Sequence, residues 1–307
     1  MHGRVAVSKK GSWCAAALLL AFACFALPVL GGAGVPPGPP TPQAGELQTI
    51  RFGLAPRQRG EEADDLRRRY RPLLDYLGQR LGARVEGLPA RSYAEEIDDL
   101  ASGRVHCASI SAVPLTEAQR QNHQVKVLVV QQSWSPDHSR KADSYAGLIV
   151  ALKSRAELAT LQDLKGRAFG FVARDSSSGF VFPNAALQAA GIEYATFFSP
   201  YVFLGSHQRL ADALAAGSID AGATSDFNLG EARKKYGDIF KVLSEVRIPN
   251  LAIATHPSLG EARRKALKQA LLAAGPALFE GLPTAGFVER PESFYDGVRR
   301  LLPAEPE

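Results

Sequence analysis

Two stretches of the chain repeat each other: residues 92–105 read SYAEEIDDLASGRV and residues 206–219 read SHQRLADALAAGSI. At a constant offset of 114 residues, a serine opens each segment, Leu and Ala follow, and a glycine stands two residues before a β-branched residue. Serine is a preferred N-cap and glycine a preferred residue at the end of a helix. Each segment therefore predicts a helix that leads into a strand, and the repeat predicts two lobes of like topology.

Short apolar strands alternate with helical patterns around both copies of this repeat. The first run holds IRFGLA, a helix over 62–81, RVEGL, VHCASI and VKVLVVQ, and the second holds RAFGFV, TFFSPYVF, IDAGAT and IFKVLSEV. Such alternation predicts mainly parallel sheets covered by helices. The segment NLAIATHP and two later helical stretches are expected to complete the first lobe after the chain has crossed back.

The N-terminal residues predict a secretory signal over 1–33. Three cations precede an apolar run, Cys14–Leu30, and small residues follow it. The run is just long enough to leave an uncleaved anchor as an alternative, and Cys24 leaves lipidation as a weaker one. Residues 34–45 are rich in Pro and Gly and predict a tether. The cations are Arg4, Lys9 and Lys10.

Charge and cysteine content narrow the class of protein. The formal net charge is +5, from 36 basic and 31 acidic residues; without the three signal cations the balance is 33 against 31. A charge so close to neutral argues against a general nucleic-acid binder. Only Cys107 lies outside the predicted signal, so no intramolecular disulfide is expected, and its strand context predicts a buried, unreactive thiol.

The stretch AFGFVARDSSSGFVFP, residues 168–183, runs from a buried strand into three serines and a glycine. Unpaired backbone NH groups at a helix start, with the positive end of the helix dipole, form an anion site. We therefore expect the NH groups and hydroxyls of Ser176, Ser177, Ser178 and Gly179 to bind an anion. The alternative is a serine N-cap beside a flexible turn, which requires one serine only.

The repeat and the strand ends add further candidates. Ligands of open α/β sheets bind beyond the carboxyl ends of the strands. Tyr93 and His207 occupy the first helical position after the repeated serines, Ser109 and Ser111 end a strand of the first lobe, and Asp226 ends one of the second. Each has a plain alternative as a surface or capping residue; a ligand-facing Asp226 would accept a hydrogen bond from a protonated oxyanion or offset an ammonium group.

Motifs of common enzyme classes are missing from the sequence. It contains no Walker lysine motif, GxSxG elbow, HExxH or paired CxxC. We therefore expect a protein that is not an enzyme and has no metal and no cofactor. The remaining enzymatic alternative is a hydrolase with Ser176, His207 and Asp226 as nucleophile, base and orienter.

Several segments, in this order and spacing, resemble the periplasmic phosphonate and phosphite binding proteins of ABC transporters. The resemblance extends from Ile50 to about Leu302. The matching segments are RPLLDYLGQRLG, SYAEEI, SYAGLIV with Tyr145, LQDLKGRAFGFV, the Ser-Ser-Ser-Gly turn, GSHQRLADALAAGSIDAGA and IPNLAIA.

The resemblance implies an α/β fold of the type II periplasmic binding protein class, with a ligand cleft between two lobes and one crossing strand in each sheet. Lobe 1 would comprise 46–148 and 250–307, and lobe 2 would comprise 149–249. It implies an exported, monomeric protein of the periplasm that closes on a small phosphorus oxyanion and delivers it to an inner-membrane ABC permease.

Carried over by position, the resemblance implies ligand contacts at Tyr93, Tyr145, His207 and the serine turn. Ser177 stands where family members commonly have Thr, His106 replaces the usual Asp, and Ala112-Val113-Pro114 replaces the usual Gly-Pro. The last two changes leave open a binding protein of the same fold for another anion or a small organic ligand, such as a sulfonate or a heterocycle.

Overall fold

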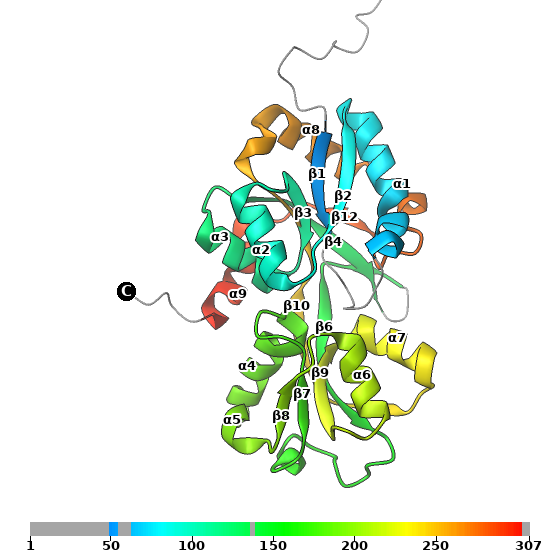
Figure 1. Cartoon of the computed structure of the whole chain (residues 1–307), viewed down its shortest axis with the longest axis vertical. Helices are drawn as coiled ribbons and strands as arrows, with labels where there is room; N and C mark the ends of the chain where they lie inside the picture. The colour runs from blue at the N-terminus through cyan, green and yellow to red at the C-terminus, as the bar shows by residue number, and fades with distance from the viewer. Residues whose placement is uncertain (1–48, 55–62, 136–138, 303–307) are drawn as a thin grey trace, which may run out of the picture. The chain divides into compact units, whose positions relative to one another are not determined.

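The computed structural model describes residues 49–54, 63–135 and 139–302 (Figure 1). All of them fall within one unit, Gln43–Glu307. The predicted signal and tether lie outside the described residues. Within the described residues, no helix combines the length and the apolar character that crossing a membrane requires.

The first sheet is built around strands that the sequence pattern predicted. β1 pairs in parallel with both β2 and β3, and Phe52 lies opposite Cys107. The thiol of Cys107 is fully buried, and burial raises its pKa. In spatial order the strands are β12 (Gly286–Val288), β4 (Lys126–Trp134), β11 (Ala252–Thr255), β3 (Cys107–Ile110), β1 (Thr49–Leu54) and β2 (Arg84–Pro89), with β5 (Lys141–Ala142) on β4.

Helices cover this sheet through apolar stripes. In α1 (Ala63–Leu81) the buried side chains follow the helical period, and Pro72 lies inside the helix. The stripe packs on the core formed by β1 and on α8. The remaining helices of this lobe are α2 (Tyr93–Ser102), α3 (Ala112–Gln121), α8 (Glu261–Leu272) and α9 (Asp296–Leu301), with short 3₁₀ turns at Pro257–Leu259, Pro276–Phe279 and Glu292–Tyr295.

The second sheet has five strands, and its core is rich in aromatic rings. Phe169 stacks on Phe198 with ring centroids 4.2 Å apart. The strand order is β10 (Phe240–Pro249), β6 (Ser144–Leu152), β9 (Ala221–Ser225), β7 (Phe169–Phe171) and β8 (Tyr201–Phe203). The flanking helices are α4 (Phe182–Ala189), α5 (Tyr194–Phe197), α6 (His207–Ala215) and α7 (Asp226–Tyr236), with a π turn at Ser177–Val181 and a 3₁₀ turn at Gln162–Leu164.

Strand directions confirm the predicted fold class and correct one detail. In the second sheet β7, β8 and β9 are parallel and β6 is the single reversed strand. In the first sheet β11 is reversed as predicted, but β12 and the two-residue β5 are also antiparallel to β4. The prediction missed these because so short an edge strand leaves no periodic pattern. The lobe boundaries stay a prediction; β6 already begins at Ser144.

The sequence repeat corresponds to a structural one. Ser92 caps α2 and accepts a hydrogen bond from the Glu95 amide at 3.2 Å, and Ser206 caps α6 and accepts one from Arg209 at 3.2 Å. Gly103 and Gly217, which follow the two helices, have φ angles of 79° and 69°. Only glycine adopts this left-handed conformation without strain, so the repeated serine and glycine fix both ends of each helix.

Candidate functional site

The serine turn follows β7 and starts the π turn. The Ser176 hydroxyl oxygen accepts the Gly179 amide at 3.0 Å, and the Ser176 amide donates to the Ala173 carbonyl at 3.1 Å. Among the described residues, no acceptor faces the amides of Ser177 and Ser178. The turn therefore offers two free NH groups, where the sequence led us to expect four.

Gly179 has a packing role instead of the predicted donor role. Its amide hydrogen is already used by Ser176. A Cβ atom at this position would lie 2.4 Å from the Cβ of Val172. No real side chain tolerates such a contact, so the residue must be glycine for the turn to pack on the end of β7.

The start of α3 in the first lobe meets this turn. The Val113 amide donates to the Ser177 hydroxyl oxygen at 3.0 Å, in a buried hydrogen bond between the two lobes. Ser111 is the N-cap of α3, but its hydroxyl makes no capping bond. The hydroxyl oxygens of Ser109 and Ser111 are buried and have no partner among the described residues. The Ser177 hydroxyl thus contacts the start of α3, and the ligand-binding role of Ser109 and Ser111 stays a prediction.

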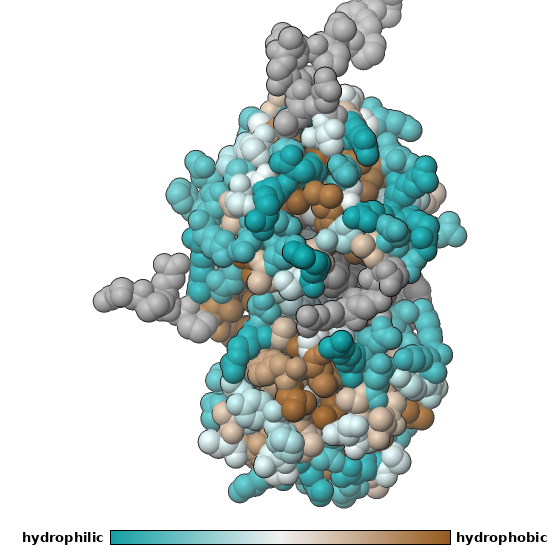
Figure 2. Space-filling view, viewed as in Figure 1, coloured by the Kyte–Doolittle hydropathy of each residue, from teal (hydrophilic) through white to brown (hydrophobic). Residues whose placement is uncertain are grey.

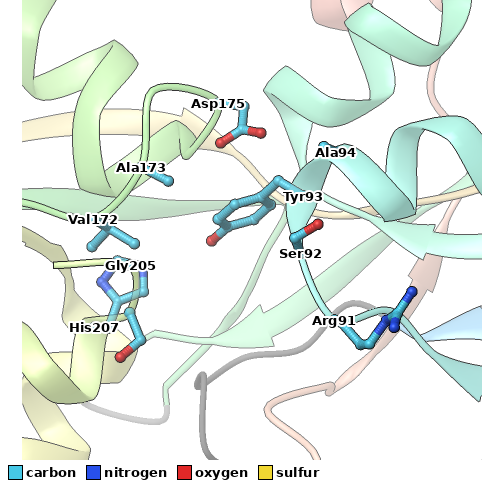
Figure 3. A pocket seen from close by; sticks show the side chains of 10 residues that line it. Arg91, Ser92, Tyr93, Ala94, Val172, Ala173, Asp175, Gly205 and His207 are labelled. Atoms are coloured by element: carbon cyan, nitrogen blue, oxygen red, sulfur yellow. The ribbon is translucent and has the colours of Figure 1, made fainter. Parts of the chain in front are cut away.

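A cavity of about 140 Å³ lies beside the turn (Figure 3). Tyr93 reaches across it, and its hydroxyl lies 3.4 Å from that of Ser176, a long distance for an O–H···O bond. Arg91 points away from Tyr93 and forms a 2.8 Å ion pair with Glu95. The lining residues are Arg91, Ser92, Tyr93, Ala94, Val172, Ala173, Asp175, Gly205, Ser206 and His207.

The second-lobe wall of the cavity is partly apolar. Val172 and Ala173 line it from the loop after β7, and Ala94 faces it from α2. Figure 2 shows apolar side chains gathered over β7 and β9 on this side of the molecule. A small ligand with a polar end and a short carbon substituent fits such a mixture of surfaces.

Burial keeps Tyr93 and His207, the donors that follow the two repeated serines, uncharged at neutral pH. It raises the pKa of Tyr93 to about 12 and lowers the pKa of His207 to about 4. The Nδ1 atom of His207 lies 3.0 Å from the Thr224 hydroxyl oxygen, in a buried contact. Both predicted residues line the cavity, and each is able to donate a hydrogen bond without carrying a charge.

Of the predicted site residues, only Tyr93 and His207 line this cavity; the others are Ser109, Ser111, Tyr145, Ser176, Ser177, Ser178, Gly179 and Asp226. The Asp226 carboxylate accepts the amides of Ala146 at 3.2 Å and Phe227 at 2.7 Å. These bonds hold β6 against the start of α7, and burial raises the carboxyl pKa. Tyr145 is half-buried on β6, opposite Ile248. Each carboxylate oxygen of Asp226 thus accepts a backbone amide, and its ligand-facing role stays a prediction.

The hydrolase alternative finds no support in the geometry. His207 contacts Thr224, whereas Asp226 bonds to backbone amides. Among the described residues, no hydrogen bond joins His207 to Asp226 or to Ser176, so they form no catalytic relay. Among the same residues, no three His, Cys, Asp or Glu side chains lie together so as to hold a metal ion.

Two acidic residues were missed from the sequence, and of these only Asp175 lines the cavity. Asp175 lines the cavity directly before the serine turn, and burial raises its pKa. Glu96 is buried in α2 with both carboxyl oxygens unpartnered. Its spacing offered a signal, because Tyr93, Glu96, Ile97 and Leu100 share one helical face.

Comparison with known proteins agrees with this geometry. Residues 52–295 match the family model described as the periplasmic substrate-binding protein of the phosphonate ABC transporter. The chain is 27% identical over 228 residues to the phosphate-import protein PhnD of Mycolicibacterium smegmatis, covering 71% of this chain and 68% of that protein.

Solved structures share the fold at lower identity. A binding protein component of an ABC phosphonate transporter from Pseudomonas aeruginosa matches with a TM-score of 0.71 and 19% identity, over 83% of this chain and 86% of that chain. PhnD1 from Prochlorococcus marinus, in complex with methylphosphonate, matches with a TM-score of 0.71 and 19% identity, over 83% and 97%. The chain belongs to the family of periplasmic substrate-binding proteins of phosphonate ABC transporters.

Proposed function

We propose that this protein captures a small phosphorus oxyanion, phosphate or a short-chain phosphonate, in the periplasm and delivers it to an ABC permease of the inner membrane. The observation that carries the proposal is the pair of free amides at Ser177 and Ser178, at a helix start where the two lobes meet. Free amides at such a position attract negative oxygen atoms.

Hydroxyl donors complete the anion site. Ser109 and Ser111 contribute buried hydroxyls without partners. Ser177 accepts from the Val113 amide, which leaves its own hydroxyl hydrogen free to donate. A hydrogen bond to a charged group contributes about 1.5–3 kcal/mol, so a few such donors give micromolar affinity, about −8 kcal/mol. Affinity of this order allows release as well as capture.

His207 acts as a neutral donor in this proposal. In this proposal the ring hydrogen lies on Nε2, so that Nδ1 accepts from the Thr224 hydroxyl, 3.0 Å away, and the Nε2–H group donates to the ligand. A bound oxyanion favours this tautomer, because the oxyanion accepts hydrogen bonds and the Nε2–H group donates one. The apolar wall at Val172 and Ala173 accommodates the carbon substituent of a phosphonate.

Isothermal titration calorimetry on ligand-free protein tests the proposal. We expect at least one of phosphate and methylphosphonate to bind with micromolar affinity. If both bind, each should displace the other. Sulfate, methanesulfonate and a heterocycle such as thiamine serve as competing ligand classes. Tight binding of one of these, with no binding of either phosphorus compound, would contradict the proposal.

Variants at the serine turn locate the site. Ser178→Ala and Ser177→Ala together remove two hydroxyl donors and should weaken binding by about tenfold or more. Asp98→Asn serves as a control, since Asp98 is exposed on the outer side of α2. Unchanged affinity in the double variant would contradict ligand binding by these two hydroxyls.

A further inference from the structure

Glu96 is a buried acid with no partner. It lies in the first turn of α2, its side chain is 3% exposed, and neither carboxyl oxygen has a hydrogen-bond partner among the described residues. Burial is the main cause that raises its pKa, and the charge of Asp175 raises it further. An ionised carboxylate without a cation is costly to bury, so this group is stable in the protein only with its proton.

Glu96 does not line the cavity of about 140 Å³, but it lies on the same face of α2 as Tyr93, which does. It follows Tyr93 by three residues, and such residues share a helix face. Tyr93 approaches Ser176, and the Asp175 charge acts on Glu96 from the residue before that serine. A neutral carboxyl group has one O–H donor, and here that donor lacks an acceptor.

The internal repeat sets this acid apart from a packing residue. At the offset of 114, Glu96 corresponds to Leu210 of α6, which is 1% exposed and packs in the core of the second lobe. An apolar side chain thus fills this helical position in the second lobe. Packing alone therefore does not explain the carboxyl group in α2.

We infer that Glu96 is a ligand-binding residue that carries a proton and donates it in a hydrogen bond to the captured oxyanion, which makes capture dependent on pH. The inference rests on the proposed function. The protonated form adds one donor to the site, whereas the ionised form would repel the anion. Affinity is therefore highest at low pH and falls as the pH rises through the pKa of Glu96.

Other titratable groups near Glu96 behave differently. Tyr93, on the same helix, has a pKa of about 12 and stays neutral across the useful range, and His207, across the cavity, has one of about 4. Asp175, on the loop before the serine turn, is the remaining acid that acts on Glu96. Removing its charge should lower the pKa of Glu96 and move the loss of affinity to lower pH.

Calorimetric titration with methylphosphonate from pH 5.5 to 9 tests the inference. Glu96→Gln keeps a neutral donor, and Glu96→Leu introduces the side chain that the second lobe has at the equivalent position. Asp98→Asn, which removes an exposed charge from the same helix, is the control. The ionisation of methylphosphonate cancels in the ratio of wild-type to variant affinity. Melting curves confirm that each variant is folded.

We expect the affinity of wild type relative to Glu96→Gln to fall by about tenfold or more towards high pH, and Asp175→Asn to shift this fall to lower pH. Glu96→Leu should bind about tenfold more weakly than Glu96→Gln at pH 5.5, and Asp98→Asn should follow wild type. Parallel pH profiles for wild type and Glu96→Gln would overturn the inference alone. Absence of wild-type binding at every pH would overturn the proposed function as well.

Discussion

The helices α2 and α6 start in the same way and then diverge. Each begins with a serine cap that accepts a 3.2 Å bond from the amide three residues later. Each places a hydrogen-bond donor at the next position, and both donors line the cavity. One turn further on, α2 buries Glu96 and α6 buries Leu210. The start of the helix is thus repeated, whereas the buried residue one turn further on is not.

Because of this difference, the stability of the two lobes responds to pH in opposite directions. His207 has a lowered pKa because burial disfavours its charged form, and Glu96 has a raised one for the same reason. Protonation of His207 at low pH therefore destabilises the second lobe, and ionisation of Glu96 at high pH destabilises the first. Burial thus favours the neutral form of both residues.

His207→Gln should produce the largest effect on stability, on the acid side. The folded pKa of His207 is about 4 and its ordinary value is 6.5. Its contribution to stability is fully present above pH 6.5 and is lost as the pH falls towards 4, by about 3 kcal/mol. Urea unfolding at pH 4.5 to 7 should show a shallower loss of stability for His207→Gln than for wild type. An equal loss would mean that this ring is not kept neutral by burial; exposed His123→Gln is the control.

Glu96→Leu should change the free energy of unfolding mainly at high pH, whereas His207→Gln changes it at low pH. The raised pKa of Glu96 means that stability is full below the ordinary value near 4.5 and is lost as the pH rises through the folded pKa. Replacing the acid should raise the free energy of unfolding at pH 8 by about 2 kcal/mol, and by less at pH 5. Denaturant midpoints of variant and wild type at the two pH values measure this. A gain independent of pH would show that only packing had changed.

The two serine caps should show the smallest difference. Ser206 is 3% exposed, whereas Ser92 is exposed. Ser206→Ala leaves a poorly hydrated amide and should cost about 1.5 kcal/mol, whereas Ser92→Ala should cost about 0.5 kcal/mol. Thermal unfolding of the two single variants measures the difference. Equal costs would mean that burial does not distinguish the two caps.

The repeat and the alternation of strands and helices predicted two α/β lobes from sequence, and the family resemblance implied the type II periplasmic binding protein class. Local signals carried this prediction: serine caps, terminal glycines and buried side chains at helical spacing. The predicted strand over 196–203 was only half correct, because Tyr194–Phe197 forms α5 and β8 begins at Tyr201. Short elements next to a proline carry too few residues for periodicity to decide between helix and strand.

For the site, the sequence determined which donors exist: the serine turn, Tyr93 and His207 each follow from a residue type at a helix start. Only the tertiary structure decided which of these groups remain free, because hydrogen-bond partners come from segments distant in sequence. The Gly179 amide is used within the turn, and Asp226 is held by the Ala146 amide. The same holds for Glu96, since burial and the absence of a partner depend on how α2 packs in the folded chain and not on the residues beside it.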